Sequence, residues 1–211
     1  GFYPAHVVLS DARRAGVRFL PVDLRHSQAG STLQSGAVRL GLQSIHGLGA
    51  EQIELLLQER RRAPFRSLAG LLRRTALPRP VVESLLLAGA LDHLHPSGDR
   101  RQLLWELAEA YRAATGPPPL ALPARDEGMT LPPMTAAERL ATEFAVTGLS
   151  ARRHPTDLRH KLFARAGALP VAQLSTLQDG QRVTVGGMVV ARQRPPTAHG
   201  ICFLALEDSS G

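Results

Sequence analysis

Apolar residues recur at helical spacing through the middle of the chain. Ile53, Leu56 and Leu57 stand at positions i, i+3 and i+4, which predicts a helix over residues 44–62. The same spacing predicts three further helices, over residues 65–74, 81–88 and 99–115, and Gly89 is the expected C-terminal cap of the second of them. The middle of the chain is therefore expected to be mainly helical.

Weaker patterns flank these helices. Residues 4–16 suggest a short helix with Val7, Val8, Ala12 and Ala15 on its apolar side. Thr135-Ala136-Ala137-Glu138 is a capping box that predicts a helix to about Val146. A further helix is expected over residues 157–166. Extended segments are expected over residues 17–24, 38–42 (a short strand or a helix start), 182–194 and 201–206. Polar residues 28–36 predict a turn, and the proline-rich residues 116–133 predict a linker.

The last two predicted strands are joined by a loop over residues 195–200, which suggests the start of a small β-barrel whose other strands are missing. The chain also opens in mid-pattern at Gly1 and stops just after a strand, at Gly211. We therefore expect a piece of a longer polypeptide.

Positive charge narrows the choice of partners. The 211 residues carry a formal net charge of +7, almost all of it from arginine, because Lys161 is the only lysine. Residues 38–115 hold 11 basic against 8 acidic side chains, and residues 139–194 hold 9 against 3. A basic balance favours nucleic acid or an anionic membrane as partner, and arginine suits phosphate through its planar, two-pronged donor. No apolar run approaches the roughly 20 residues that span a bilayer, so we expect no membrane association.

Residues 44–51, read SIHGLGAE, combine two glycines with the start of a helix. Gly47 and Gly49 allow a tight bend, and the amides of the following helical turn have no intrahelical partner. Such amides attract anions, so this turn is a candidate phosphate site, with an ordinary turn between two helices as the alternative.

Other chemistries find little support. Cys202 is the lone cysteine, which excludes an intrachain disulfide and fits a cytoplasmic protein. His93 and His95 are near each other but lack a third partner, so metal binding is not expected. No serine or cysteine has a base placed beside it in a recognisable motif.

Short motifs follow one another in a specific order: GFYP (1–4), DARRAGV (11–17), PVD (21–23), RLGL (39–42), GLG (47–49), FRSL (65–68), VESL (82–85), AGALD (88–92), TGLS (147–150) and HP (154–155). In this order and spacing, the chain resembles the bacterial C-family DNA polymerases. The basic stretch over residues 191–200 is most similar to their error-prone, damage-inducible branch. The replicative alpha subunit of DNA polymerase III is the close alternative.

The resemblance implies an α+β fold in which a mainly α-helical, tandem helix-hairpin-helix region precedes the start of an incomplete OB-fold barrel. It implies five regions in chain order: the end of the fingers region (1–37), a helix-hairpin-helix DNA-binding domain (38–115), a proline-rich linker (116–134), a helical connector (135–180) and the N-terminal strands of an OB-fold domain (181–211).

The resemblance implies that the parent protein is an Mg²⁺-dependent DNA-directed DNA polymerase of translesion synthesis and repair. Its metal-binding aspartates would lie upstream of Gly1, in a palm domain. None of Asp11, Asp23, Asp92 and Asp99 stands in such an acidic cluster. We therefore expect a C-terminal portion that needs no cofactor of its own, grips duplex and single-stranded DNA, and is inactive alone. A non-enzymatic DNA-binding adaptor and a module that docks other translesion or replication proteins are the rival interpretations.

The candidate DNA-binding residues are Gly47, Leu48, Gly49, Arg60, Arg61, Arg62, Arg79, Arg192 and Arg194. The arginines at 60–62 have a second interpretation as a solvated helix end. With His199, Arg192 and Arg194 border a loop of the kind that binds single strands. Phe203 is a possible stacking platform, but its alternation with Ile201 and Ala205 favours a place in the core.

Residues 117–123, read PPPLALP, occupy the place where replicative relatives carry a sliding-clamp-binding peptide. Such a peptide usually has a glutamine at its start and an aromatic residue near its end. Neither is present, so we interpret this segment as a plain linker rather than a clamp-binding site.

Overall fold

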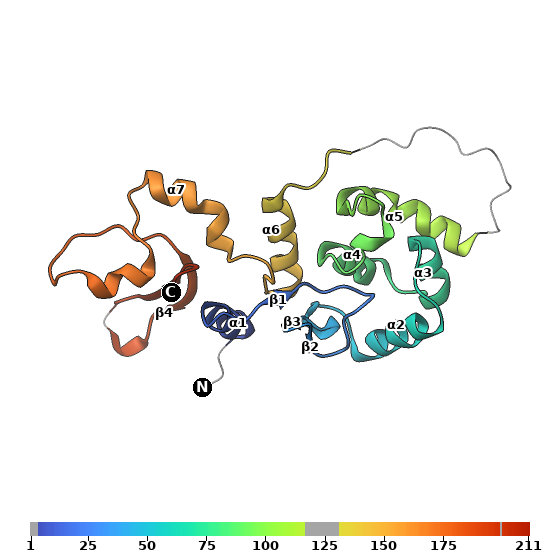
Figure 1. Ribbon diagram of the computed structural model, residues 1–211, viewed down its shortest axis with the longest axis horizontal. Coiled ribbons are helices and arrows are strands. Elements are labelled where there is room, and N and C mark those ends of the chain that lie inside the picture. Colours follow the sequence, from blue (N-terminus) through green and yellow to red (C-terminus); the bar gives the residue numbers. More distant parts are fainter. Residues whose placement is uncertain (1–3, 117–130, 199) are drawn as a thin grey trace. The chain divides into compact units, whose positions relative to one another are not determined.

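The computed structural model describes residues 4–116, 131–198 and 200–211. The chain forms two compact units, which Figure 1 shows as a ribbon. Residues 18–151 make up one, here called the central unit. Residues 1–17 and 152–211 make up the other, here called the terminal unit. The linker expected at 116–133 and the clamp-peptide position at 117–123 lie mostly or wholly outside the described residues.

Helices dominate the central unit, as the apolar spacing predicted. They are α2 (Ala50–Arg62), α3 (Leu68–Thr75), α4 (Arg79–Leu87), α5 (Arg100–Thr115) and α6 (Ala136–Thr147), with 3₁₀ turns η1 (Leu42–Ser44) and η2 (Asp92–Leu94). The α3 helix packs on α5, and α4 packs on both α5 and α6. The predicted apolar positions Leu56, Val82, Leu85, Leu86 and Leu107 are all fully buried, and Leu71, which was not predicted, joins them in the core. Burying these side chains is the main force that holds short helices together.

A small sheet precedes the helices. The strands β1 (Phe19–Leu20) and β2 (Thr32–Gln34) flank β3 (Ala37–Arg39), which pairs parallel with β1 and antiparallel with β2. Ser35 and Gly36 between β2 and β3 both have positive φ, as a two-residue hairpin turn requires.

The expectation of a polar turn over residues 28–36 was therefore wrong for β2. The signal was hidden because β2 is an edge strand, whose one large apolar side chain, Leu33, is 80% exposed. An edge strand with no buried face lacks the apolar alternation by which strands are recognised.

The terminal unit contains α1 (Ala5–Arg14), α7 (His160–Arg165), β4 (Met188–Gln193), β5 (Phe203–Glu207) and the 3₁₀ turns η3 (Pro155–Arg159), η4 (Val171–Thr176) and η5 (Pro196–Ala198). The strands β4 and β5 pair antiparallel, with an irregularity between Val189 and Ala191. Within the described residues this sheet has two strands and no closed barrel. The whole chain is thus an α+β protein.

Gly186 and Gly187 explain why the predicted strand over 182–194 shortens to β4. A Cβ at Gly186 would press on the ring of Phe163, and one at Gly187 would lie 2.9 Å from the carbonyl oxygen of Glu207. Side chains would not fit at these two glycines, and the paired strand begins at the next residue, Met188.

Two burial expectations for the terminal unit were wrong. Val8, expected on the apolar side of α1, is 57% exposed, whereas Leu9 is buried. Phe203, for which the core was favoured, is 55% exposed, as is most of β5. Phe203 is exposed because a two-stranded sheet offers few side chains to cover its faces.

Candidate nucleic-acid interface

The turn over residues 45–49 links η1 to α2 and is fixed from within. Ile45 and Leu48 turn their side chains into the core, and the Leu48 amide donates to the Ile45 carbonyl at 3.3 Å. Gly47 has φ +81°, a backbone conformation that residues other than glycine rarely adopt. Among the predicted residues, Leu48 therefore contributes an anchor for the turn, whereas Gly47 sets its bend.

Gly49 is a different case, because its backbone is extended with φ −75°. A Cβ there would have only the Gln52 side chain as a neighbour, at 3.8 Å. Neither backbone strain nor crowding within the chain accounts for a glycine here. A bare backbone at an exposed position is what a closely approaching external group needs.

The amino end of α2 lacks a side-chain cap. Ser67 caps α3, Asp99 caps α5 and Thr135 caps α6, each by accepting an amide of the first turn. At α2 the residue in this position is Gly49, and the Gln52 side chain bonds back to the Gly49 amide at 3.0 Å. The first-turn amides of α2 therefore have no protein acceptor in an intrahelical or capping bond, although the Glu51 carboxylate lies on the same turn.

The α6 helix supports this turn, a role that the sequence did not indicate. The His46 amide donates to the Val146 carbonyl at 2.8 Å, next to the end of α6. Gly148 then ends the helix with φ +63°, where a Cβ would sit 3.6 Å from the His46 ring. The end of α6, which carries the TGLS motif, thus holds the turn in place.

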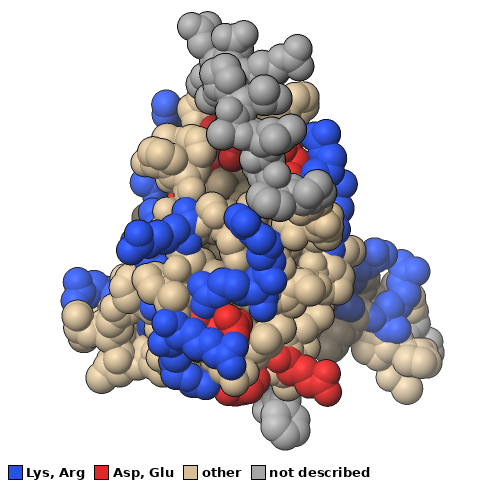
Figure 2. All heavy atoms as spheres, turned by 90° about the vertical axis from the view of Figure 1, so that its right-hand side faces the viewer, with Lys and Arg blue, Asp and Glu red and all other residues tan. Residues whose placement is uncertain are grey.

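Arginines gather on the face that carries α2 and α3, around a smaller acidic area (Figure 2). Arg61 and Arg62 are 64% and 66% exposed. Arg61 pairs with Glu54 at 3.0 Å, and Arg62 pairs with the buried carboxylate of Glu59. The Arg61–Glu54 pair is exposed on both sides and therefore weak, so the Arg61 guanidinium remains available to an incoming phosphate. Arg62 is bound to a buried carboxylate, but its exposed guanidinium has five N–H donors and keeps some of them for a phosphate.

Arg60 has an internal role. Its guanidinium donates to the carbonyls of Leu24 and Ser27, at 2.8 and 2.6 Å, and burial lowers its pKa. The structure thus separates Arg60, which ties the loop between β1 and β2 to α2, from the more exposed Arg61 and Arg62. The turn at Gly49 lies at the other end of α2, roughly 20 Å away for 13 residues, so the two groups would meet different phosphates.

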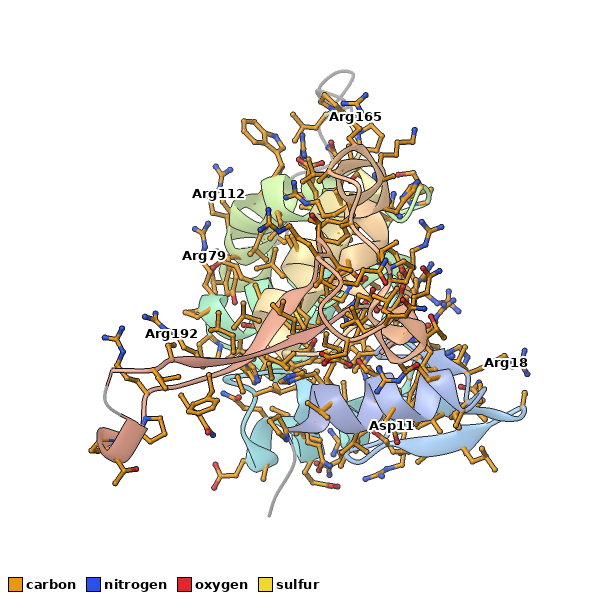
Figure 3. The ribbon with its side chains drawn as sticks, turned by 90° about the vertical axis from the view of Figure 1, so that its left-hand side faces the viewer. Asp11, Arg18, Arg79, Arg112, Arg165 and Arg192 are labelled. Carbon is orange, nitrogen blue, oxygen red and sulfur yellow. The ribbon has the colours of Figure 1, made fainter. Side chains whose placement is uncertain are left out.

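Arg79 begins α4 and pairs with Glu83 at 2.7 Å, with 59% of its side chain exposed. Figure 3 shows Arg79 and Arg112 pointing outward from the helices that carry them. In the terminal unit, Arg192 on β4 and Arg194 just after it are both exposed. Figure 3 shows Arg192 standing off the strand pair. His199 lies outside the described residues.

An ion-pair network around the buried Arg100, which sequence reasoning missed, connects η2, α5 and α6. The Arg100 guanidinium bonds both carboxylate oxygens of Asp92, at 2.7 and 3.0 Å, and one of Glu143, at 2.7 Å. Burial opposes its charge, but these carboxylates outweigh burial and raise the pKa of Arg100. Gly89, with φ +79°, gives the guanidinium room, since a Cβ there would collide with it.

The described part of the chain offers neither a metal-binding cluster nor a membrane-spanning helix. No three histidine, cysteine, aspartate or glutamate side chains come together there in a way that could hold a metal ion. None of the helices described is long and apolar enough to cross a membrane.

Comparisons with known proteins agree on one family. The helix-hairpin-helix motif model matches residues 16–103. The error-prone DNA polymerase of Corynebacterium glutamicum is 39% identical over 213 aligned residues, which cover 100% of this chain and 19% of the relative. Those of Corynebacterium diphtheriae and Teredinibacter turnerae are 37% and 36% identical, again over 100% of this chain and over 20% and 21% of their own lengths. The chain therefore spans about a fifth of the curated relatives that it matches.

Proposed function

Because the chain belongs to the error-prone branch of the bacterial C-family DNA polymerases, we propose that it is a DNA-gripping portion of such an enzyme. In this proposal the chain holds DNA through backbone phosphates, and the polymerase acts in translesion synthesis and repair. The nucleotidyl transfer itself belongs to another part of the polymerase.

The observation that carries the proposal is the open amino end of α2, next to the bare backbone of Gly49. Backbone amides and the positive end of the helix dipole together attract a phosphate without reading a base. The match to a helix-hairpin-helix motif over this region supports the same contact. The exposed Arg61 and Arg62 at the other end of α2, and Arg79 on α4, would meet further phosphates of the duplex.

We assign single-stranded template to the terminal unit. Arg192 and Arg194 are exposed beside the apolar side chains of β5, including Phe203 and Leu204. Positive charge interleaved with exposed aromatic and aliphatic groups is typical of surfaces that bind single strands. The strand pair is proposed to be the beginning of an OB fold.

The salt dependence of duplex binding tests the proposal. Fluorescence anisotropy of a labelled 20-base-pair duplex should give an affinity that falls steeply as salt rises, by roughly 0.9 in log–log slope for each phosphate contacted. Duplexes of different sequence should bind alike. Primer extension by the same preparation should be absent, because the proposed role is gripping rather than catalysis. A flat salt response, a marked preference for one base sequence, or incorporation of nucleotides would contradict the proposal.

A further inference from the structure

A pocket of about 260 Å³ opens at the carboxyl end of α2, away from the hairpin turn. Its walls include Arg25, Arg60 and Arg61, the apolar residues Pro64 and Phe65, and His93. No carboxylate is among the described residues that line it. The pocket is slightly smaller than the about 300–1,000 Å³ typical of sites that enclose a drug-sized ligand, so it suits the anionic group and a small apolar part of a ligand whose remainder stays outside.

Two of the guanidiniums are held in fixed positions. Arg25 bonds both oxygens of Asp23, at 2.8 and 3.2 Å from different nitrogens, and Arg60 is fixed by the carbonyls of Leu24 and Ser27. Arg61 adds a third guanidinium at the exposed side. A guanidinium has five N–H donors, so each of the three keeps donors for a ligand. Fixed donors lose little freedom on binding, which favours recognition of an anion.

His93 provides an independent sign of a missing partner. Its side chain is only 9% exposed, and its Nδ1 atom has no hydrogen-bond partner, lying 3.9 Å from Asp23. Leaving a buried polar atom unpaired is costly, so an unpaired ring nitrogen in a pocket wall needs an explanation. Burial lowers the pKa of His93, which favours the neutral ring beside the three guanidiniums.

We propose that this pocket binds one nucleotide, with the phosphate against Arg25 and Arg61 and the sugar or base against Pro64 and Phe65. The nucleotide is either free or part of an unpaired DNA strand, and the second source rests on the proposed function. About 20 Å of α2 separates the pocket from the Gly49 turn, so it would be a second, distinct contact.

The direct test is a titration of the isotope-labelled protein, followed by NMR of the arginine Nε–H signals. Deoxythymidine monophosphate should shift the Arg25, Arg60 and Arg61 signals, whereas thymidine without phosphate should shift them far less. An unlabelled oligothymidylate of eight nucleotides distinguishes the two sources. A strand that produces the same shifts at lower concentration identifies the site as a contact for single-stranded DNA, and shifts from the mononucleotide alone identify a site for free nucleotide.

The Arg25→Gln variant should weaken mononucleotide binding by about tenfold, as expected when one hydrogen bond between charged groups is lost. Arg112→Gln is the matched control, because Arg112 is exposed on α5 outside the pocket. A third variant, His93→Gln, keeps a polar group but changes the ring, and should also weaken binding while circular dichroism shows an intact fold. Equal weakening by Arg25→Gln and Arg112→Gln, or shifts spread over arginines outside the pocket, would overturn the proposal.

The proposed function can fail separately. Shifts in the pocket without any duplex binding would leave this site standing and overturn the DNA-gripping role. Salt-dependent duplex binding without any shifts from the mononucleotide would support the DNA-gripping role and overturn the nucleotide site in the pocket.

Discussion

Gly89 and Arg100 show how a charged side chain from another helix can require a glycine at one position. Arg100 is 3% exposed and joins the carboxylates of Asp92 and Glu143. The sequence predicts that Gly89 ends a helix, and it does have positive φ just after α4. The guanidinium that fills the space beside Gly89 comes from another helix, so local pattern could not reveal it. Gly49 differs, because nothing inside the chain requires a glycine there.

Gly89→Ala should destabilise the central unit by about 3 kcal/mol, because the added methyl group would push the buried Arg100 away from the buried carboxylate of Glu143 and the half-buried one of Asp92. Gly47→Ala is the matched control. Gly47 has a similar φ of +81° but open space around it, so it should lose only the backbone term of about 1 kcal/mol. Urea unfolding of both variants measures the difference. Equal losses would mean that Arg100 adapts freely and the network contributes little.

Asp23 should make stability depend on pH in the acid range. Burial would raise the pKa of this carboxyl, but its bonds to Arg25 and His26 lower it to about 2. A carboxyl whose folded pKa lies below its unfolded value stabilises the fold above the unfolded pKa. That contribution is lost as pH falls from about 4 through 2.

The check is the free energy of unfolding at pH 4 and pH 2, from urea titrations. The wild type should lose more stability over this interval than Asp23→Asn does, while the exposed Asp11→Asn control should follow the wild type. An identical acid slope for wild type and Asp23→Asn would show that Asp23 is not the group responsible.

At the scale of the elements, the helices were predictable from the sequence, but the contacts between distant elements that hold them in place were not. Periodic leucines fix α2, α3, α4 and α5, because each needs to bury one apolar stripe. The capping box likewise marks α6, with the Thr135 hydroxyl accepting from the Glu138 amide at 3.2 Å. That α6 holds the turn through His46 and Val146 depends on a backbone bond across 100 residues, which leaves no trace in local sequence.

The strand pair β4–β5 has its own expected effect on DNA. Changing both Arg192 and Arg194 to glutamate should reduce affinity for a single strand more than for a duplex, because the hairpin region of the central unit would still hold the duplex. Fluorescence anisotropy with both substrates at one salt concentration measures this. Arg159→Glu with Arg165→Glu gives a control of equal charge change at other exposed positions of the terminal unit. Equal losses on the two substrates would mean that Arg192 and Arg194 act only through general charge.

At the scale of the whole molecule, net charge and the order of the motifs predicted the family, but they did not predict the position of each functional side chain. The net charge of +7 and the order of the motifs pointed to a DNA polymerase family, and this chain is 39% and 37% identical along its whole length to two error-prone DNA polymerases. Charge alone did not distinguish arginines that bind internal groups from arginines that are exposed to a ligand. Arg60, Arg74 and Arg100 are taken up by internal carbonyls and carboxylates, whereas Arg61, Arg62 and Arg79 stay exposed. Only packing decides which arginine faces a ligand. The domain boundaries and the DNA-binding residues remain predictions.

The most direct test of the central claim compares Gly49→Asp with Gly49→Asn. Either side chain can cap α2 and occupy its open amides, and the Cβ has room, so both variants should be as stable as the wild type or slightly more stable, by a few tenths of a kcal/mol. If these amides bind a DNA phosphate, duplex affinity measured by anisotropy should fall in both variants. The affinity of Gly49→Asp should be lower than that of Gly49→Asn by roughly tenfold or more, because the aspartate charge also repels the phosphate. Two well-folded variants that bind the duplex as tightly as the wild type would show that the turn is only structural and would contradict the account.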